Sequence, residues 1–186
     1  MKTEIEARLL DINEKNFIEL MKKHNATFVG DWLMRRYCYD FKPIDDNRWI
    51  RLRTTGEETT LTIKEVVDGG IEGTRETEIV VSDFDTTNEI LNKLGYTARS
   101  SQTNRRIRYI LDDVEIDIDF WPLIPTYVEF EAESAQKIKD LCKKLEINFD
   151  SLTTMSVPEV YNHYGKNVRD NPDVLFLEED RANTKY

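Results

Sequence analysis

The stretch Glu4-Ile5-Glu6-Ala7-Arg8-Leu9 alternates charged and apolar residues along its whole length. Successive side chains of a β-strand point to opposite faces of the sheet, so the three charged residues share one face of a strand and the three apolar residues share the other. This stretch therefore predicts a strand whose two faces have opposite chemical character.

Five further segments of the chain repeat this division into a charged and an apolar face. They are residues 49–53, 60–64, 106–109, 115–119 and 128–131. A sheet with one solvated face explains any one of these segments. Together they carry paired arginines on some strands and paired carboxylates on others, which favours an enclosed polar interior. Arginine pairs suit bidentate contacts with phosphate oxygens, and clustered carboxylates suit a hard divalent cation.

The period-two pattern predicts eight strands, separated by a few helices. The strands are expected at residues 3–11, 27–41, 48–54, 59–66, 74–81, 96–111, 114–120 and 126–132. The helices are expected at residues 13–24, 83–94, 134–145 and 157–164. The fold class expected is therefore α+β with mainly antiparallel β structure, as a closed eight-stranded tunnel barrel with a polar interior and helices packed outside.

Length and charge narrow the classes of protein that the chain can belong to. Its 186 residues fit one domain, at residues 1–166, followed by an acidic C-terminal tail at residues 167–186 that is either flexible or laid on the body. The net charge of −10 argues against a nucleic-acid-coating protein. Two cysteines make neither a disulfide framework nor a zinc motif. The sequence shows no signal peptide or membrane span, so a cytoplasmic location is expected.

Taken in chain order, the charged segments resemble the motifs of a known family. Residues 4–8 look like an ExExR variant of an ExExK motif, and residues 128–131 look like a closing VExE strand. Residues 49–53, 61–65, 75–78, 104–108 and 116–119 resemble the strands between them. This ordered set is similar to the CYTH or triphosphate tunnel metalloenzyme superfamily. That family includes class IV adenylate cyclases, thiamine triphosphatases and inorganic tripolyphosphatases.

The resemblance implies a role for each charged residue. Divalent metal, Mg²⁺ or Mn²⁺, would be bound by Glu4, Glu6, Asp117, Asp119, Glu129 and Glu131, with Asp117 and Asp119 competing for one position. The triphosphate would be bound by Arg8, Arg51, Arg53, Lys64, Arg106 and Arg108. Glu76 and Glu78 would bind a second metal, orient the basic residues or form structural salt bridges with neighbouring arginines. The catalytic residues would be Glu4, Glu6 and Arg8.

Arg8 departs from the family pattern, which has a lysine at this position. A buried lysine can lose its proton near neutral pH and activate water, whereas arginine stays protonated in proteins. Arg8 can therefore bind phosphate or orient the nucleophile, but it is not expected to act as a base.

The resemblance implies three functions, of which the first is the favoured hypothesis and the other two stay open as alternatives. The first is metal-dependent hydrolysis of a linear triphosphate, such as tripolyphosphate, thiamine triphosphate or a nucleoside triphosphate. The second is an adenylate cyclase of class IV type that converts ATP to cyclic AMP and pyrophosphate. Its base pocket would be formed by aromatic residues, and packing in the core or at the rim explains each of them equally well. The residues are Trp32, Tyr37, Tyr39, Trp49 and Trp121. The third is an inactive triphosphate-binding sensor.

The same interpretation of the sequence predicts which molecules the protein binds. They are a small-molecule triphosphate or polyphosphate and, as an open alternative, a second copy of the chain in a homodimer. Neither nucleic acid nor a membrane is expected as a partner.

Overall fold

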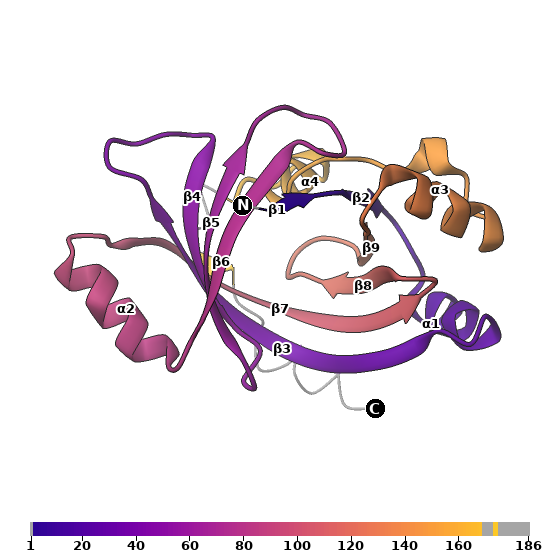
Figure 1. The fold of residues 1–186 in the computed structure, drawn as a ribbon, viewed down its shortest axis with the longest axis horizontal. Coiled ribbons are helices and arrows are strands. Elements are labelled where there is room, and N and C mark those ends of the chain that lie inside the picture. The colour runs from indigo at the N-terminus through magenta and orange to yellow at the C-terminus, as the bar shows by residue number, and fades with distance from the viewer. Residues whose placement is uncertain (1, 169–172, 175–186) are drawn as a thin grey trace.

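A computed structural model describes residues 2–168 and 173–174, and it shows an α+β fold built on one mainly antiparallel sheet (Figure 1). The strands are β1 (Lys2–Glu4), β2 (Glu6–Leu9), β3 (Thr27–Asp40), β4 (Arg48–Thr54), β5 (Thr59–Val66), β6 (Thr74–Val81), β7 (Ala98–Leu111), β8 (Val114–Phe120), β9 (Tyr127–Glu131) and β10 (Asp173–Val174). The helices are α1 (Glu14–Lys23), α2 (Phe84–Lys93), α3 (Ala135–Lys144), the 3₁₀ turn η1 (Phe149–Ser151) and α4 (Val157–His163). None of the described helices is long and apolar enough to cross a membrane.

The strands follow the order β1-β6-β5-β4-β3-β7-β8-β9-β2, and β10 lies parallel beside β7. Seven of the eight predicted strands are each present as one strand, within a few residues of the expected bounds. The prediction of one continuous first strand was wrong. That stretch divides at Ile5, because β1 pairs with β6 whereas β2 pairs with β9.

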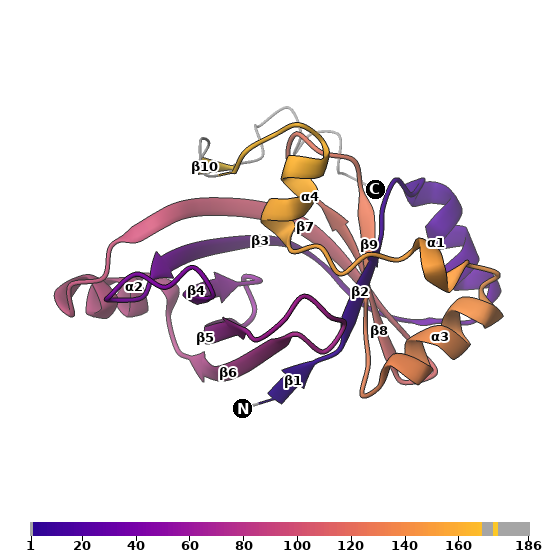
Figure 2. The same cartoon turned by 90° about the horizontal axis from the view of Figure 1, so that it is seen from above.

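β1 and β2 stand at the two ends of the strand order, and they are not paired with each other. They are nevertheless successive parts of one stretch of chain, and Figure 2 shows them following one another between the two halves of the sheet. Strand pairing alone therefore does not close the sheet. The closed eight-stranded barrel stays a prediction at this point.

The main hydrophobic core lies outside the sheet, between its apolar face and helices α1 and α3 (Figure 1). Ile107, Ile116, Ile118, Val128 and Phe130 form the sheet side of this core, and none of them is more than 4% exposed. A second cluster lies between β3, β4 and helix α2. The apolar faces predicted from the alternating pattern are therefore the faces that the helices cover.

The helices begin and end where local capping chemistry dictates. The side chains of Asn13, Asp83 and Ser134 accept hydrogen bonds from backbone N–H groups in the first turns of α1, α2 and α3. Gly95 follows α2 with a φ of +89°, a left-handed conformation that glycine adopts without strain. These caps therefore set where α1, α2 and α3 begin and where α2 ends.

Helix α4 packs separately, in a third cluster with Trp121, Tyr127 and Val174. Val174 belongs to β10, so this short part of the predicted C-terminal tail adds to the sheet beside β7. The remainder of that predicted tail lies outside the described residues, apart from residues 167 and 168.

Replacing Phe130 with alanine is expected to lower the free energy of unfolding by about 3–5 kcal/mol, because it leaves a cavity in a packed core. Phe130 is 0% exposed and lies on the apolar face of β9. Urea unfolding measures the loss. The control is F28A, since Phe28 is 57% exposed and should lose far less stability. Equal losses in the two variants would show that the core does not lie where the fold places it.

Candidate functional site

Strand pairing places four of the predicted site residues in one line across the sheet. Arg8 of β2 lies opposite Glu129 of β9. Glu129 in turn lies opposite Asp117 of β8, which lies opposite Arg108 of β7. Directly opposed side chains on one face of a sheet are within contact distance. We call this face of the sheet the charged face.

Arg106 is the most heavily paired cation of the charged face. Its guanidinium forms ion pairs with Asp117, with Asp119 at 2.5 Å and with Glu129 at 3.1 Å. Arg106 is only 8% exposed, and burial by itself disfavours its charged form. The three carboxylates outweigh that effect and raise the pKa of Arg106 well above its ordinary value. Arg106 therefore remains a fixed positive charge.

Arg8 lies between two of the predicted metal ligands. Its Nη2 atom is 2.6 Å from Glu129 and 2.8 Å from Glu6, and its Nη1 atom donates to the Met155 carbonyl oxygen at 2.7 Å. Burial would raise the pKa of Glu129, but Arg8 and Arg106 hold it well below its usual range. Arg8 thus acts as a resident counter-ion for the carboxylates of β2 and β9.

Three carboxylates occupy the next line across the same strands. Glu131 of β9 lies opposite both Glu6 of β2 and Glu115 of β8. Like charges placed directly opposite one another destabilise a sheet unless a cation joins them. Arg108 supplies one such cation, at 2.6 Å from Glu115. Glu115 was not among the predicted site residues, although it continues the alternation that identified Asp117 and Asp119.

Lys64 joins the N-terminal strand to the other half of the sheet. Its Nζ atom is 2.9 Å from Glu4 and 2.6 Å from Glu76. Burial raises the pKa of Glu4 to about 8, with Glu6 and Glu76 adding to the effect and Lys64 opposing it. Burial therefore favours the protonated form of Glu4 more strongly than Lys64 favours the charged form.

Arg51 and Arg53 lie two residues apart on β4 and share the carboxylate of Glu78. The distances to that carboxylate are 3.4 Å and 3.9 Å, and Arg51 is also 3.2 Å from Glu76. The pKa of Arg53 is lowered to about 9, chiefly by the charge of Arg51 and then by burial. Positive charge is thus in excess here. As placed, Glu76 and Glu78 form ion pairs with these cations.

Arg36 of β3 is a cation of the same face that the sequence analysis missed. It lies opposite Arg53 of β4 and is 7% exposed. Its guanidinium donates to the Asn104 side chain and lies 4.5 Å from the centre of the Trp121 ring. The alternation of Met34, Arg36 and Cys38 along β3 could have placed it on this face, but no family motif covers the segment.

The aromatic residues considered for a base pocket lie in different places. Tyr37 and Tyr39 belong to the outer cluster under helix α2. Trp121 is packed between Arg36 and the ring of Tyr161. Trp32 donates to Glu57 at 3.1 Å. Of the five aromatic residues, Trp32 and Trp49 are the two near the charged face that do not pack in these ways. The structure therefore does not gather the five aromatic residues into one pocket.

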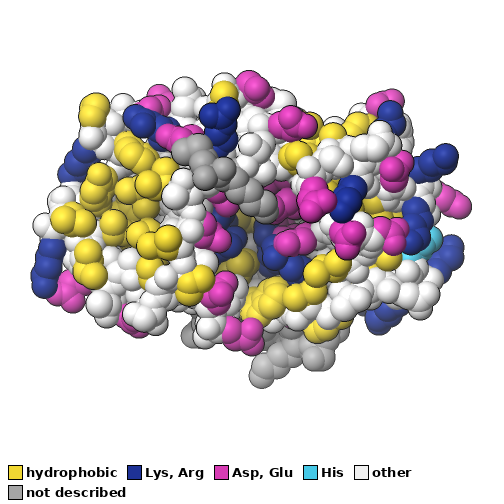
Figure 3. All heavy atoms as spheres, viewed as in Figure 1, with side chains coloured by type: hydrophobic (Ala, Val, Ile, Leu, Met, Phe, Trp, Pro, Cys, Tyr) yellow, Lys and Arg dark blue, Asp and Glu magenta, His cyan; other side chains and the backbone are white. Residues whose placement is uncertain are grey.

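The space-filling view shows acidic and basic side chains gathered together in a hollowed region at the centre of the molecule (Figure 3). Apolar side chains cover broad areas beside this region. The hollow is where opposite charges from separate strands meet, and it is the candidate functional site.

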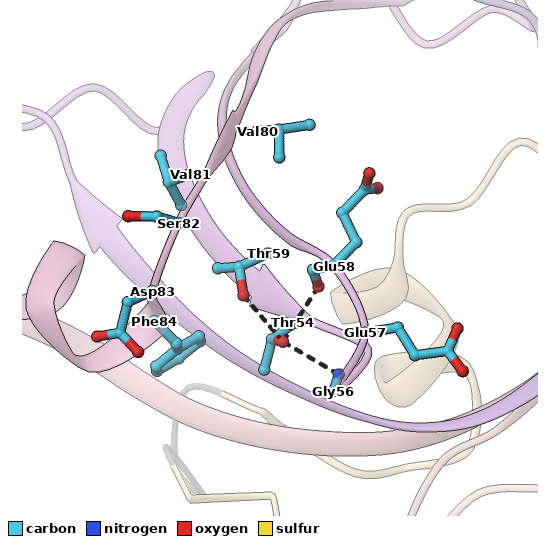
Figure 4. Close-up of a pocket in the computed structure, with 10 residues that line it drawn as sticks. All are labelled: Thr54, Gly56, Glu57, Glu58, Thr59, Val80, Val81, Ser82, Asp83 and Phe84. Atoms are coloured by element: carbon cyan, nitrogen blue, oxygen red, sulfur yellow. Dashed lines mark hydrogen bonds between the residues drawn. The ribbon is translucent and has the colours of Figure 1, made fainter.

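A pocket of about 400 Å³ lies elsewhere, between the β4–β5 hairpin and the start of helix α2 (Figure 4). Its lining includes the carboxylates of Glu57, Glu58 and Asp83 and the apolar side chains of Val80 and Phe84. No lysine or arginine is among the residues that line it. A polyanion would be repelled there, so the charged face, and not this pocket, is the site to which the chemistry points.

The donor chemistry of the charged face suits a hard divalent cation, because carboxylate oxygens are the ligands that Mg²⁺ and Mn²⁺ prefer. As placed, however, no three His, Cys, Asp or Glu side chains of residues 2–168 and 173–174 are gathered in a metal-binding group. Glu6 and Glu129 face Arg8 instead. Asp117 and Asp119 are both paired with Arg106, so the structure does not choose between them. The metal ligands stay a prediction.

Comparisons with known proteins agree with this arrangement. A model of the CYTH domain matches residues 2–155. A conserved hypothetical protein from Pyrococcus furiosus is similar in structure, with a TM-score of 0.72, 21% identity and coverage of 85% of this chain and 99% of that one. No curated protein sequence matches the chain.

Two further solved structures carry functional descriptions. A putative adenylate cyclase from Vibrio parahaemolyticus has a TM-score of 0.71, 15% identity and coverage of 87% and 98% of the two chains. A putative adenylyl cyclase from Hippeastrum, described as having a dominant triphosphatase activity, has a TM-score of 0.59, 15% identity and coverage of 89% and 97%. At these identities the likeness concerns the fold alone.

Proposed function

The chain belongs to the CYTH domain family, and from that premise we propose that it is a metal-dependent hydrolase of linear triphosphates. The observation that carries the proposal is the division of charge on the charged face. Carboxylates crowd β2, β8 and β9, whereas β3 and β4 carry arginines that the carboxylates only partly offset. A divalent metal bound by the carboxylates and a polyanion bound by the arginines would neutralise both sets of charges.

We propose further that the N-terminal stretch joins the two ends of the sheet into a tunnel. β1 pairs with β6 and β2 pairs with β9, and only Ile5 separates the two strands. Ile5 itself accepts a hydrogen bond from the backbone of Ala132, and Glu6 donates one to the carbonyl oxygen of Ile71. The deep burial of charged residues on the inner face supports an enclosed interior.

Each group of residues has a distinct role in the proposed reaction. Glu4, Glu6, Glu129 and Glu131 would hold Mg²⁺ or Mn²⁺, with Asp117 or Asp119 completing the set. The bound metal supplies positive charge to the phosphate oxygens and lowers the pKa of water. Glu76 and Glu78 would orient the basic residues.

The basic residues would hold the substrate and stabilise charge in the transition state. Arg51 and Arg53 would bind the phosphate chain, with Lys64, Arg106 and Arg108 around it. Charge that spreads over the transferred phosphoryl group is stabilised by donors fixed in advance, and the ion pairs of Arg51 with Glu76 and Glu78 provide that fixation. Arg8 would orient substrate and carboxylates, since a guanidinium so closely paired with anions does not give up its proton.

Hydrolysis is favoured over cyclisation because the structure supplies little for a nucleobase. Tyr37 and Tyr39 pack under α2, and one face of Trp121 is already covered by Arg36. A class IV-type adenylate cyclase remains the second candidate, since the Vibrio parahaemolyticus structure is described as a putative adenylate cyclase. The Hippeastrum protein, described by its dominant triphosphatase activity, supports the first.

Wild-type protein is expected to release phosphate from a linear triphosphate only when Mg²⁺ or Mn²⁺ is present, and to lose this activity in EDTA. Tripolyphosphate, thiamine triphosphate and ATP are incubated with each metal, and both free phosphate and cyclic AMP are measured. If cyclic AMP were the main product, the protein would be an adenylate cyclase and not a hydrolase. Metal-dependent binding of the triphosphate with no product would identify an inactive sensor, and undiminished turnover in EDTA would contradict the metal requirement.

A further inference from the structure

Arg36 is a buried cation that forms few contacts with polar groups in the part of the chain that the structure describes. It is 7% exposed, and no carboxylate of the described residues forms an ion pair with it. Among residues 2–168 and 173–174, its guanidinium donates to the side chain of Asn104, and its Nε atom has no hydrogen-bond partner. An uncompensated buried charge is costly to keep in a folded protein. A bound anion would remove that cost.

The surroundings of Arg36 contain other cations. Burial, followed by the charges of Arg51 and Arg106, lowers the pKa of Arg36 to about 10, against the opposing effect of Asp119. Arg53 lies directly opposite on β4 and is itself affected by the charge of Arg36. Arg36 and Arg53 therefore form a pair of facing guanidinium groups with excess positive charge.

The side chain of Arg36 is also held in place before any ligand arrives. One side of its guanidinium lies 4.5 Å from the centre of the Trp121 ring, and the ring of Tyr161 packs edge-on against Trp121. Asn104 accepts from Arg36 and donates to Asp119 at 3.1 Å. A side chain fixed in this way loses little conformational entropy when it binds an anion.

The position of this pair extends the line of cations along the sheet. Lys64 lies opposite Trp49, Arg51 lies two residues further along β4, and Arg53 two residues beyond that. Two residues along a strand correspond to about 6–7 Å. The line from Lys64 through Arg51 to Arg53 and Arg36 therefore suits an extended chain of phosphates better than one compact group.

We infer that Arg36 and Arg53 form a further phosphate subsite, which binds the end of a linear polyphosphate that lies furthest from Glu4. The inference rests on the proposed function and adds Arg36 to the residues that bind the phosphate chain of the substrate. Trp121 and Asn104 are positioning residues, since they hold Arg36 and do not themselves contact the phosphate.

The test compares R36Q with R35Q. Arg35 is the neighbouring residue on β3, but it points to the other face, where it pairs with Asp85 at 3.2 Å and packs against Phe84. Binding of tripolyphosphate and of pyrophosphate is measured by calorimetry with Mg²⁺. R36Q is expected to weaken tripolyphosphate binding about tenfold or more, because a hydrogen-bonded ionic contact is lost. The affinity of R36Q for pyrophosphate, which leaves the subsite empty, should differ from that of wild type by less than about twofold. R35Q should bind both ligands as tightly as wild type does.

A general structural defect would weaken both ligands in the same proportion, so the dependence on chain length is the decisive readout. R36K keeps the charge and should retain part of the lost affinity, and it replaces R36Q if thermal unfolding shows that R36Q does not fold. If wild type binds tripolyphosphate and R36Q binds it as tightly as R35Q does, the subsite is overturned and the proposed function stays intact. No binding of either ligand by wild type would overturn both.

Discussion

The R51Q variant is expected to hydrolyse its triphosphate substrate with a kcat about 10²–10³-fold below that of wild type. Removal of one fixed donor to developing charge in a transition state typically has an effect of this size. Arg51 is 9% exposed and is held by Glu76, Glu78 and the Thr62 hydroxyl, so its guanidinium is aimed before substrate arrives. Steady-state phosphate release with saturating Mg²⁺ gives kcat and KM.

The matched control for this prediction is R48Q, on the same strand. Arg48 faces away from the charged face, its side chain is 42% exposed, and it pairs with Asp45 at 2.7 Å. Its loss should leave kcat within about twofold of wild type, as is usual for exposed ion pairs. If R51Q kept more than a tenth of the wild-type kcat, Arg51 would not stabilise the transferred phosphoryl group.

The R106M variant is expected to lose about 3–5 kcal/mol of its free energy of unfolding at pH 7, because it leaves buried carboxylates without their cation. Asp117, Asp119 and Glu129 all pair with Arg106, and Asp119 is 0% exposed. Urea unfolding measures the loss. Arg105 offers a comparison, because it is similarly buried but its partner Asp31 has a side chain that is 38% exposed. R105M should therefore lose less stability than R106M.

The loss in R106M should shrink as the pH falls. Burial already raises the pKa of Asp119, although Arg106 opposes it, so removal of Arg106 raises that pKa further. A carboxyl whose folded pKa exceeds its unfolded pKa destabilises the fold at high pH, and the penalty disappears as the pH falls from the folded toward the unfolded value. The gap between wild type and R106M should therefore narrow between pH 7 and pH 4. A gap that widens on acidification would contradict the charge pairing.

Much of the fold could be predicted from the sequence because one physical signal, the alternation of charged and apolar residues, runs along nearly every strand. The bounds of β4, β5, β6 and β8 agree with the prediction to the residue. The division of the first strand at Ile5 could not be predicted. It depends on which strands lie on either side, and those neighbours are distant in the chain.

The candidate site could be predicted from the same alternation, but only in part. The alternation identified the paired residues, such as Arg51 and Arg53, because each pair repeats at a spacing of two. Arg36 was missed because it is a single cation between the apolar side chains of Met34 and Cys38. Its importance comes from Trp121 and Asn104, which reach it only in the folded sheet.

Anomalous diffraction from a crystal grown with Mn²⁺ and tripolyphosphate is the most direct test of whether metal and polyanion meet on the charged face. We expect an anomalous peak bounded by Glu6, Glu129 and Glu131, with the phosphate chain extending from it toward Arg51 and Arg53. A manganese peak outside this face, or a polyphosphate bound away from these arginines, would contradict it.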